Sequence, residues 1–476
     1  MKKIKVFGAA VLLLTGFACT SDFEETNKNP NNISQISPGT LLNPVIYNLA
    51  SHNANRAASI TFDLMQVSLP YPSVTGGLHR YDVSNSIGES SWNNYYRWLA
   101  NIREMRAAAE KAEDENYLAV ALTLNAWAYS NLTDLFGPVP MTEATRGEEG
   151  IIYPAYDTQE YIYETLLKDL EDANAMYNDE SMVYASDILF ANDVEKWQKF
   201  TNSLHMRLLL RISNRPETGA FEKLAQMAQN PEVYPVFEST EESAILQVTG
   251  VTPNMSPWDR PQDFRLGVKM ASFFVDNLNT WNDPRLPVIA TQAKDLQNNN
   301  IGYVGIPSAY DGPDSQFNYE ASTFNIAQVT NPMQIFILTY AEVEFIKAEL
   351  AQRGYIGDAE IHYNNGVTAA MEQLKTEVPA GYFDNEGIQY DGTLQKIMLQ
   401  KYYALYFVDY QQWFEYRRTG MPELPTTSAM LNNAIMPARL PYPPSQQLDN
   451  PQNYAEGVQL LGGTDDINTH VWWDIN

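Results

Sequence analysis

The chain has 476 residues, with 58 Asp and Glu against 31 Lys and Arg, so its formal net charge is −27. Nucleic-acid binding depends on cationic contacts to phosphate, and this excess of acid argues against a nucleic-acid partner. The single cysteine leaves no second thiol for a disulfide within the chain and too few for a typical cysteine zinc site.

The first 18 residues have the pattern of a signal peptide. Lys2, Lys3 and Lys5 are followed by a short apolar run over residues 6–18, which is too short to span a bilayer comfortably. The single cysteine, Cys19, comes directly after this run, and small residues precede it. This arrangement resembles a bacterial lipobox, which predicts that Cys19 becomes the lipid-modified N-terminus. The alternative is an ordinary secreted protein with an incidental cysteine.

Residues 19–38 are expected to form a tether. Residues 21–25 (SDFEE) are acidic and resemble the surface-export signal of Bacteroidetes lipoproteins, and residues 26–38 are rich in Asn, Pro and Ser. Such a composition cannot bury enough apolar surface to form a core. No low-complexity linker divides the chain after this point, so residues 39–476 are predicted to form one large domain.

Helical periodicity dominates the rest of the chain. Apolar residues recur at helical spacing, with start and stop signals, in several segments: 116–136, a helix opened by Asp157 and Glu160 as a capping box, 197–212, 340–353, 358–374 and 394–418. These segments form pairs joined by short turns. The predicted fold is therefore mainly α, a tetratricopeptide-like scaffold of helical hairpins with a large irregular region.

Three segments break this periodicity. Residues 66–91 carry Pro70, Pro72, Gly76 and Gly77, and the stretch of about 230–333 carries ten prolines among many Gly and Asn. Residues 422–476 are also expected to be irregular. Ordered loops on a helical scaffold are where recognition usually occurs, so the variable region of about 230–333 is the expected ligand region.

Seven segments together resemble the SusD/RagB family of Bacteroidetes outer-membrane lipoproteins. They span nearly all of the chain after the signal peptide: 129–140 (YSNLTDLFGPVP), 195–212 (EKWQKFTNSLHMRLLLRI), 340–349 (YAEVEFIKAE), 400–405 (QKYYAL), 413–422 (WFEYRRTGMP), 436–443 (MPARLPYP) and 472–474 (WWD). The resemblance implies a helical SusD-like fold and a lipid-anchored position on the outer membrane, facing the cell exterior. It also implies a role as the ligand-capturing lid of a SusC-type TonB-dependent transporter that imports glycans.

Three other functions stay open. Some relatives such as RagB handle peptides, so an oligopeptide-binding lipoprotein is the main alternative, followed by a surface enzyme and a purely structural lid. The chain shows no zinc-protease, serine-hydrolase or phosphate-loop motif, and we predict no enzyme and no cofactor. Two groups of oxygen ligands, Asp311–Asp314 and Asp384–Glu386, do not follow the EF-hand pattern and are interpreted as ordinary turns, so no metal is predicted.

A glycan site in a non-enzyme needs aromatic faces with polar groups beside them, usually in a preformed pocket. Trp127, Trp197 and Trp413 fall inside predicted helices and are assigned to the core, while Trp472 and Trp473 are expected to dock the C-terminal tail. In the starch-binding relative an early Trp joins aromatics from the later region, and Trp92 is similarly placed. The predicted ligand-binding candidates are Tyr71, Arg80, Tyr81, Trp92, Asn94, Trp258, Asp259, Arg260, Asp263, Phe264, Trp281, Tyr303, Tyr310 and Tyr319.

Overall fold

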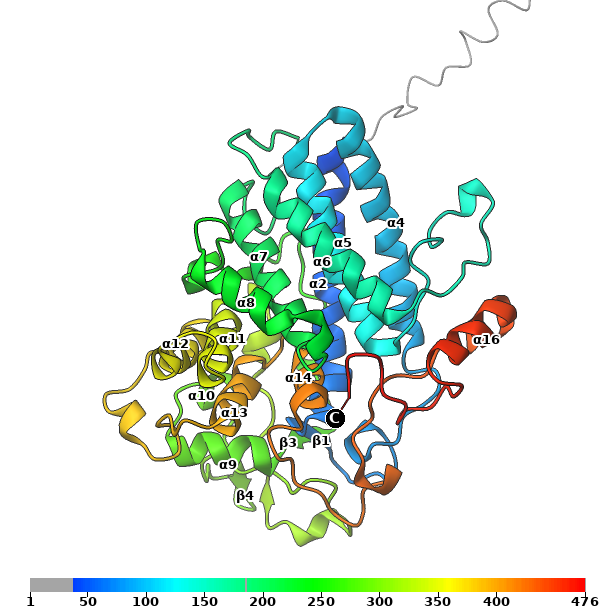
Figure 1. Ribbon diagram of the computed structural model, residues 1–476. Helices are drawn as coiled ribbons and strands as arrows, with labels where there is room; N and C mark the ends of the chain where they lie inside the picture. Colours follow the sequence, from blue (N-terminus) through cyan, green and yellow to red (C-terminus); the bar gives the residue numbers. More distant parts are fainter. Residues whose placement is uncertain (1–36, 185, 476) are drawn as a thin grey trace, which may run out of the picture.

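The computed structural model describes residues 37–184 and 186–475 (Figure 1). The predicted signal peptide, Cys19 and nearly all of the predicted tether lie outside the described residues. None of the described helices is both long and apolar enough to cross a membrane.

The first helical group covers the N-terminal half of the chain. Successive helices pack side by side, α4 on α2, α5 on α4, α6 on α5, α7 on α6 and α8 on α7. Their bounds are α2 Pro38–Arg56, α3 Phe62–Leu64, α4 Glu89–Ala112, α5 Glu115–Phe136, α6 Gln159–Met176, α7 Val194–Arg211 and α8 Ala220–Gln229. Capping explains several of the starts, since the side chains of Asp114, Thr158 and Asp193 each accept a backbone N–H of the first turn.

The second helical group lies beside α7 and α8. Its members are α11 Tyr340–Gln352, α12 Ala359–Glu372, α13 Leu394–Ala404 and α14 Gln411–Thr419. Helix α11 packs against both α12 and α13 and also touches α7, which joins the two groups. The predicted fold, a mainly α scaffold of stacked helical hairpins, is confirmed.

The structure corrects three local predictions. The helix that begins near residue 158 is capped by Thr158, while the carboxylate of Asp157 accepts the N–H groups of Met141 and Thr142. The tail contains two helices, α15 Pro444–Asp449 and α16 Pro451–Leu460. Each of them has a proline in its first turn, where no backbone N–H is needed, so these prolines start helices instead of preventing them.

The predicted helix 394–418 is divided into α13 and α14. Phe407 and Asp409 lie between the two with φ of 65° and 31°. The buried carboxylate of Asp409 accepts hydrogen bonds from the side chains of Gln411 (2.8 Å) and Asn131 (3.3 Å). These tertiary contacts to α5 stabilise a break that the periodicity of the segment does not indicate.

The irregular half contains three small antiparallel sheets of two strands each: β1 Ser68–Pro70 with β3 Val268–Met270, β2 Ala244–Val248 with β6 Met333–Leu338, and β4 Lys294–Asp295 with β5 Tyr319–Glu320. Helices α9 Ser272–Trp281 and α10 Leu286–Ile289 lie in the same half. In Figure 1 this half occupies the lower end of the molecule, and α2 runs from the upper end, where residue 38 lies, down towards β1 and β3.

The core confirms the predicted role of the helix tryptophans. Trp127, Trp197, Trp413 and Trp473 are all among the largest fully buried side chains. Buried ion pairs join the two helical groups, since Arg207 of α7 pairs with Glu342 of α11 and Arg211 of α7 pairs with Glu415 of α14. Within the second group, the guanidinium of Arg418 binds both Glu349 and Glu415. Buried charges need such partners, because an unpaired ion in the interior is costly.

Candidate functional site

The two proline-rich segments meet at the lower end of the molecule. Pairing of β1 with β3 places Pro70 opposite Val268, and the N–H of Tyr71 then donates to the carbonyl of Gly267 at 2.8 Å. Directly after β3, Ala271 forms a parallel bridge with Ile306. Residues 71 and 306–320 are therefore neighbours although they are more than 230 positions apart.

Four rings from these segments form an aromatic cluster, consisting of Tyr71, Tyr310, Phe317 and Tyr319. The ring centroids of Tyr310 and Phe317 lie 5.0 Å apart, those of Phe317 and Tyr319 5.7 Å, and the ring of Tyr71 lies 6.4 Å from both Tyr310 and Phe317. Tyr310 is buried, with 8% of its surface exposed, while the other three rings are half-buried. The cluster therefore offers partly exposed aromatic surface above an apolar base of Leu69, Ala271 and Ile306.

Polar contacts fix the backbone of this cluster. One guanidinium nitrogen of buried Arg80 donates to the hydroxyl of Ser73 and to the carbonyl of Tyr310, both at 2.9 Å. The Ser73 hydroxyl also donates to that carbonyl at 3.0 Å. The hydroxyl of Tyr319 donates to the Gly305 carbonyl. The site is thus largely preformed, as ligand pockets usually are.

The charges around the cluster are mainly acidic. The ammonium of Lys269 lies 5.8 Å from the centroid of the Tyr71 ring, but it is paired with Glu320 at 2.9 Å, and this pairing lowers the pKa of Glu320. Burial raises the pKa of Tyr71, and the carboxylates of Asp314 and Glu320 raise it further. Burial and the Asp314 carboxylate, which accepts the Tyr310 hydroxyl at 2.9 Å, likewise raise the pKa of Tyr310. The tyrosines therefore remain neutral hydrogen-bonding groups in a negative surrounding.

Four of the predicted candidates come together here: Tyr71, Tyr310 and Tyr319 as rings and Arg80 beneath them. The contacts of Arg80 hold the backbone of the cluster in place. They do not direct its guanidinium towards a ligand. Sequence reasoning missed Phe317 and Lys269. Phe317 could have been found, since it lies between two candidates in the same irregular segment, whereas Lys269 becomes part of the site only through the pairing of β1 with β3.

Trp92 and Asn94 lie in the first turns of α4 and not in a loop. Trp92, Tyr95 and Leu99 form the inward face of that helix, and Trp92 is only 4% exposed. Its ring is surrounded by those of Tyr96, Phe136, Tyr156 and Tyr442. Trp92 also borders a groove that is lined by residues of the segment 140–154 and of α15. The helical spacing that assigns other tryptophans to the core applies equally to Trp92.

Two further aromatic candidates are buried. Trp281 ends α9, is 4% exposed and packs with its ring edge against Tyr403 at 5.1 Å. Tyr81 is 2% exposed, and burial raises its pKa to about 12. Tyr303 is half-buried against the main core, away from the aromatic cluster. Trp281 and Tyr81 therefore belong to the packed interior and offer no surface to a ligand.

The candidates between residues 258 and 264 divide into a packed aromatic pair and an exposed polar group. Phe264 is buried and Trp258 is half-buried, and the two rings pack against each other at 5.0 Å and both contact Phe407. Asp259, Arg260 and Asp263 are exposed, and Arg260 pairs with Asp263 at 2.9 Å. None of these residues contributes a ring to the aromatic cluster.

Among residues 37–184 and 186–475, no group of three or more His, Cys, Asp or Glu side chains could hold a metal ion. At the turn of residues 311–314, a carboxylate oxygen of Asp311 accepts the N–H of Gly312, and Asp314 accepts the Tyr310 hydroxyl. These local contacts are those of an ordinary turn.

Comparisons with known proteins identify the family and the fold of the chain. Residues 30–443 match a family model, SusD-like, described as starch-binding and associating with the outer membrane. A solved structure described as a chitin-binding protein is 25% identical and has a TM-score of 0.79, over 92% of this chain and 99% of that chain. A SusD homologue from Bacteroides fragilis is 23% identical with a TM-score of 0.80, over 92% and 100% of the two chains. A chitin-binding SusD homologue from Flavobacterium johnsoniae is 22% identical with a TM-score of 0.75, over 91% and 99%. No curated protein matches the chain.

Proposed function

The chain belongs to the SusD-like family of starch-binding proteins that associate with the outer membrane, and from this premise we propose that it captures a glycan at the aromatic cluster. It then passes the glycan, as a lid, to a SusC-type TonB-dependent transporter. Proteins of this family bind ligands and are not enzymes, so we assign no catalytic residue.

The observation that carries this proposal is that the rings of Tyr71, Tyr310, Phe317 and Tyr319 lie together. Hydrogen bonds from Arg80 and Ser73 hold the backbone beneath them in place. Sugar rings present C–H faces that pack on aromatic rings, and their hydroxyls need polar groups at the edge. The phenolic hydroxyls, Lys269 and Glu320 supply such groups. The rings are held in place before a ligand arrives, which reduces the entropy lost on binding.

The charges at the cluster favour a neutral glycan. Asp311, Asp314 and Glu320 lie at the cluster, whereas Lys269 is already paired with Glu320 and the Arg80 guanidinium is engaged by Ser73 and by backbone carbonyls. A sulfated or uronate-containing glycan would be repelled by these carboxylates. The similarity to a chitin-binding protein at 25% identity makes N-acetylated neutral oligosaccharides the first class to test.

We place the protein on the cell exterior, anchored by lipid at Cys19, with residues 39–476 as one domain. Residue 38 begins α2, and strands β1 and β3, which adjoin the aromatic cluster, lie near the other end of that helix (Figure 1). Nineteen helical residues span about 28 Å. The domain would thus hold its ligand site away from the anchored end.

The test is isothermal titration of the full-length protein in lipid nanodiscs. The panel contains chitin and starch oligosaccharides, uronate-containing and sulfated oligosaccharides, and mixed oligopeptides. We expect binding of a neutral class, weakened about tenfold or more by Tyr71→Ala and by Phe317→Ala, since stacking contacts contribute on the order of 1 kcal/mol each. Tyr161→Ala, which removes an exposed ring of α6, is the matched control.

The other outcomes reject the proposal in different ways. Binding of peptides alone would make the protein an oligopeptide-binding lipoprotein. If a glycan binds and neither Tyr71→Ala nor Phe317→Ala weakens its binding, the glycan site lies elsewhere on the surface. No binding across the panel would mean that affinity requires the transporter.

A further inference from the structure

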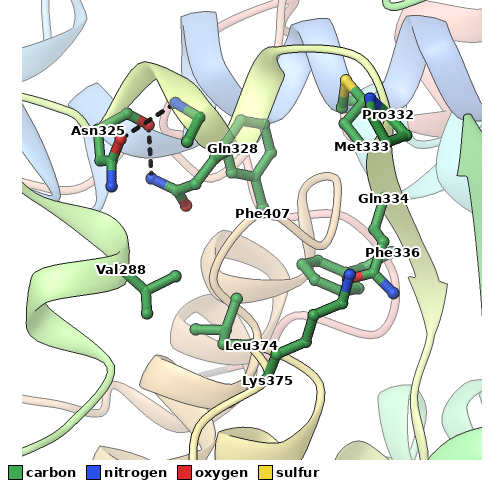
Figure 2. A pocket seen from close by; sticks show the side chains of 12 residues that line it. Val288, Asn325, Gln328, Pro332, Met333, Gln334, Phe336, Leu374, Lys375 and Phe407 are labelled. Atoms are coloured by element: carbon green, nitrogen blue, oxygen red, sulfur yellow. Dashed lines mark hydrogen bonds between the residues drawn. The ribbon is translucent and has the colours of Figure 1, made fainter. Parts of the chain in front are cut away.

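A second pocket, of about 190 Å³, lies between the irregular half and the second helical group (Figure 2). It shares no residue with the aromatic cluster. Its walls come from α2, α10, the segment 325–336 and the turns that follow α12 and α13. The lining residues are Ala54, Val288, Asn325, Ala327, Gln328, Pro332, Met333, Gln334, Phe336, Leu374, Lys375 and Phe407.

One part of this pocket is apolar. Val288, Leu374 and Phe407 face its interior from three different elements, and Met333 and Phe336 of β6 complete the wall (Figure 2). A dry apolar cavity of roughly 150 Å³ accepts a benzene ring. The pocket therefore has room for an apolar group of about that size.

Most polar atoms on the opposite wall are already engaged. The amide nitrogen of Gln328 donates to the carbonyls of Ile289 at 2.8 Å and Asn325 at 3.3 Å. The side-chain oxygen of Asn325 accepts the N–H of Ala327 at 3.1 Å. These bonds stabilise the wall and leave it few donors for a ligand.

The side-chain polar groups of Lys375 and Gln334, unlike those of Gln328 and Asn325, are not engaged in hydrogen bonds with the described residues. Within the described part of the chain, neither the Lys375 ammonium nor the Gln334 side-chain amide forms a hydrogen bond or an ion pair with another residue. Figure 2 shows the Lys375 side chain extending towards the end of the pocket where Gln334 and Phe336 lie. Lys375 is the charged residue among the twelve that line the pocket, in a chain with 58 acidic and 31 basic residues. An ammonium that no side chain of the described residues pairs can bind an anionic group of a ligand.

Two lining residues have a left-handed backbone. Lys375 has φ of 59° and Phe407 has φ of 65°, a left-handed conformation that residues with a side chain rarely adopt. At Lys375 this conformation ends α12, since the N–H of Thr376 donates to the carbonyl of Met371, and at Phe407 it belongs to the break between α13 and α14. Here they direct one cation and one aromatic ring to the same pocket.

We propose that this pocket binds a small monocarboxylate whose apolar part is about the size of a phenyl ring. The ring lies against Val288, Leu374 and Phe407. The carboxylate accepts hydrogen bonds from the Lys375 ammonium and the Gln334 amide nitrogen, and the bond from the ammonium is of the stronger, charge-assisted kind. This is a second ligand site, independent of glycan capture.

The test compares 3-phenylpropionate with its neutral counterpart 3-phenylpropionamide by isothermal titration of the full-length protein in nanodiscs, with empty nanodiscs as the blank. We expect the acid to bind at least tenfold more tightly than the amide. Lys375→Gln should weaken binding of the acid about tenfold and leave the amide unchanged. Val288→Trp, which fills the apolar part from a half-buried position, should abolish binding of both. Lys111→Gln, at an exposed lysine of α4, is the matched control.

Equal affinity for acid and amide, or binding of the acid that Lys375→Gln leaves unchanged, would overturn the proposal. So would the absence of binding at millimolar ligand. Lys375 is exposed, so its substitution is not expected to disturb folding, and the test does not depend on the bulkier variant. Glycan binding, measured on the same samples, should be unaffected by both pocket variants.

Discussion

The indole N–H of Trp473 donates a 2.6 Å hydrogen bond to the carboxylate of Asp134, 339 residues earlier in the chain. Trp473 is fully buried, and the guanidinium of Arg417 lies 4.4 Å from its ring centroid. The same carboxylate also accepts the hydroxyl of Tyr163 at 2.7 Å. The C-terminal tail is therefore part of the helical core, joined to α5 and α6.

Replacing this indole should destabilise the whole domain. Trp473→Phe removes one donor from a buried carboxylate and leaves a cavity, so we expect the free energy of unfolding to fall by about 2–4 kcal/mol. Urea unfolding followed by circular dichroism measures it. Trp472→Phe, at the half-buried neighbour, is the control and should cost less than about 1 kcal/mol. Equal effects of the two variants would refute the assigned role of Trp473.

The buried pairs of Arg418 should matter far more than surface pairs. Arg418→Met leaves Glu349 and Glu415 without their shared cation, and breaking such a buried pair costs about 3–5 kcal/mol. Lys168→Met breaks the exposed pair with Asp172 and should change the free energy of unfolding by less than about 0.5 kcal/mol. The comparison is made at one salt concentration, and a small effect of Arg418→Met would contradict the prediction.

Arg80 is expected to act on glycan binding without touching the glycan. Arg80→Lys cannot hold Ser73, the Tyr310 carbonyl and the Ala429 carbonyl together, as the guanidinium does. We expect the glycan affinity of the variant to fall about tenfold. The enthalpy of glycan binding should keep its sign, and the variant should stay folded. Titration and a thermal scan of the same sample measure the two effects. If the variant binds the glycan as tightly as the unchanged protein, the aromatic cluster does not depend on the hydrogen bonds of the Arg80 guanidinium.

Stability should decline in mild acid because of buried histidines. Burial lowers the pKa of His205 to about 4, the Glu171 carboxylate opposes this shift and Lys223 adds to it. The unfolded chain takes up the proton near pH 6.5, whereas the folded chain does so only near pH 4, so stability is lost as pH falls between these values. From pH 7 to pH 5 the loss through His205 is about 2 kcal/mol.

Urea unfolding at the two pH values tests this effect. In His205→Asn that part of the pH dependence should vanish, although the variant is less stable throughout. His470 is the contrasting case, since its hydrogen bond with Asp474 raises its pKa and its contribution has the opposite sign. An unchanged pH slope in His205→Asn would show that this histidine is not the source.

The proposed anchor has a direct test. Cys19→Ala should abolish metabolic labelling by a radioactive fatty acid and release the protein from the outer-membrane fraction. An incidental cysteine would instead leave both labelling and fractionation unchanged. Thr20→Ala, which alters the neighbouring position, serves as the control.

The sequence by itself determined the helical scaffold. Helical spacing in residues such as Leu118, Leu122 and Ala126, with the stop at Gly137, predicted α5 to within one residue, because such periodicity and capping are local. For the same reason Trp127, Trp197 and Trp413 were assigned to the core. The irregular segments were recognised from their prolines and glycines.

Only the tertiary structure decided which of the irregular residues come together. Tyr71 meets Tyr310 through the pairing of β1 with β3, and a contact between such distant residues leaves no periodic signal in either segment. The same holds for the burial of Trp281 by α13 and for the break between α13 and α14, where the contact of Asp409 with α5 outweighs the helical pattern. Local chemistry determines each element of this protein, whereas the ligand surfaces exist only where distant elements pack against one another.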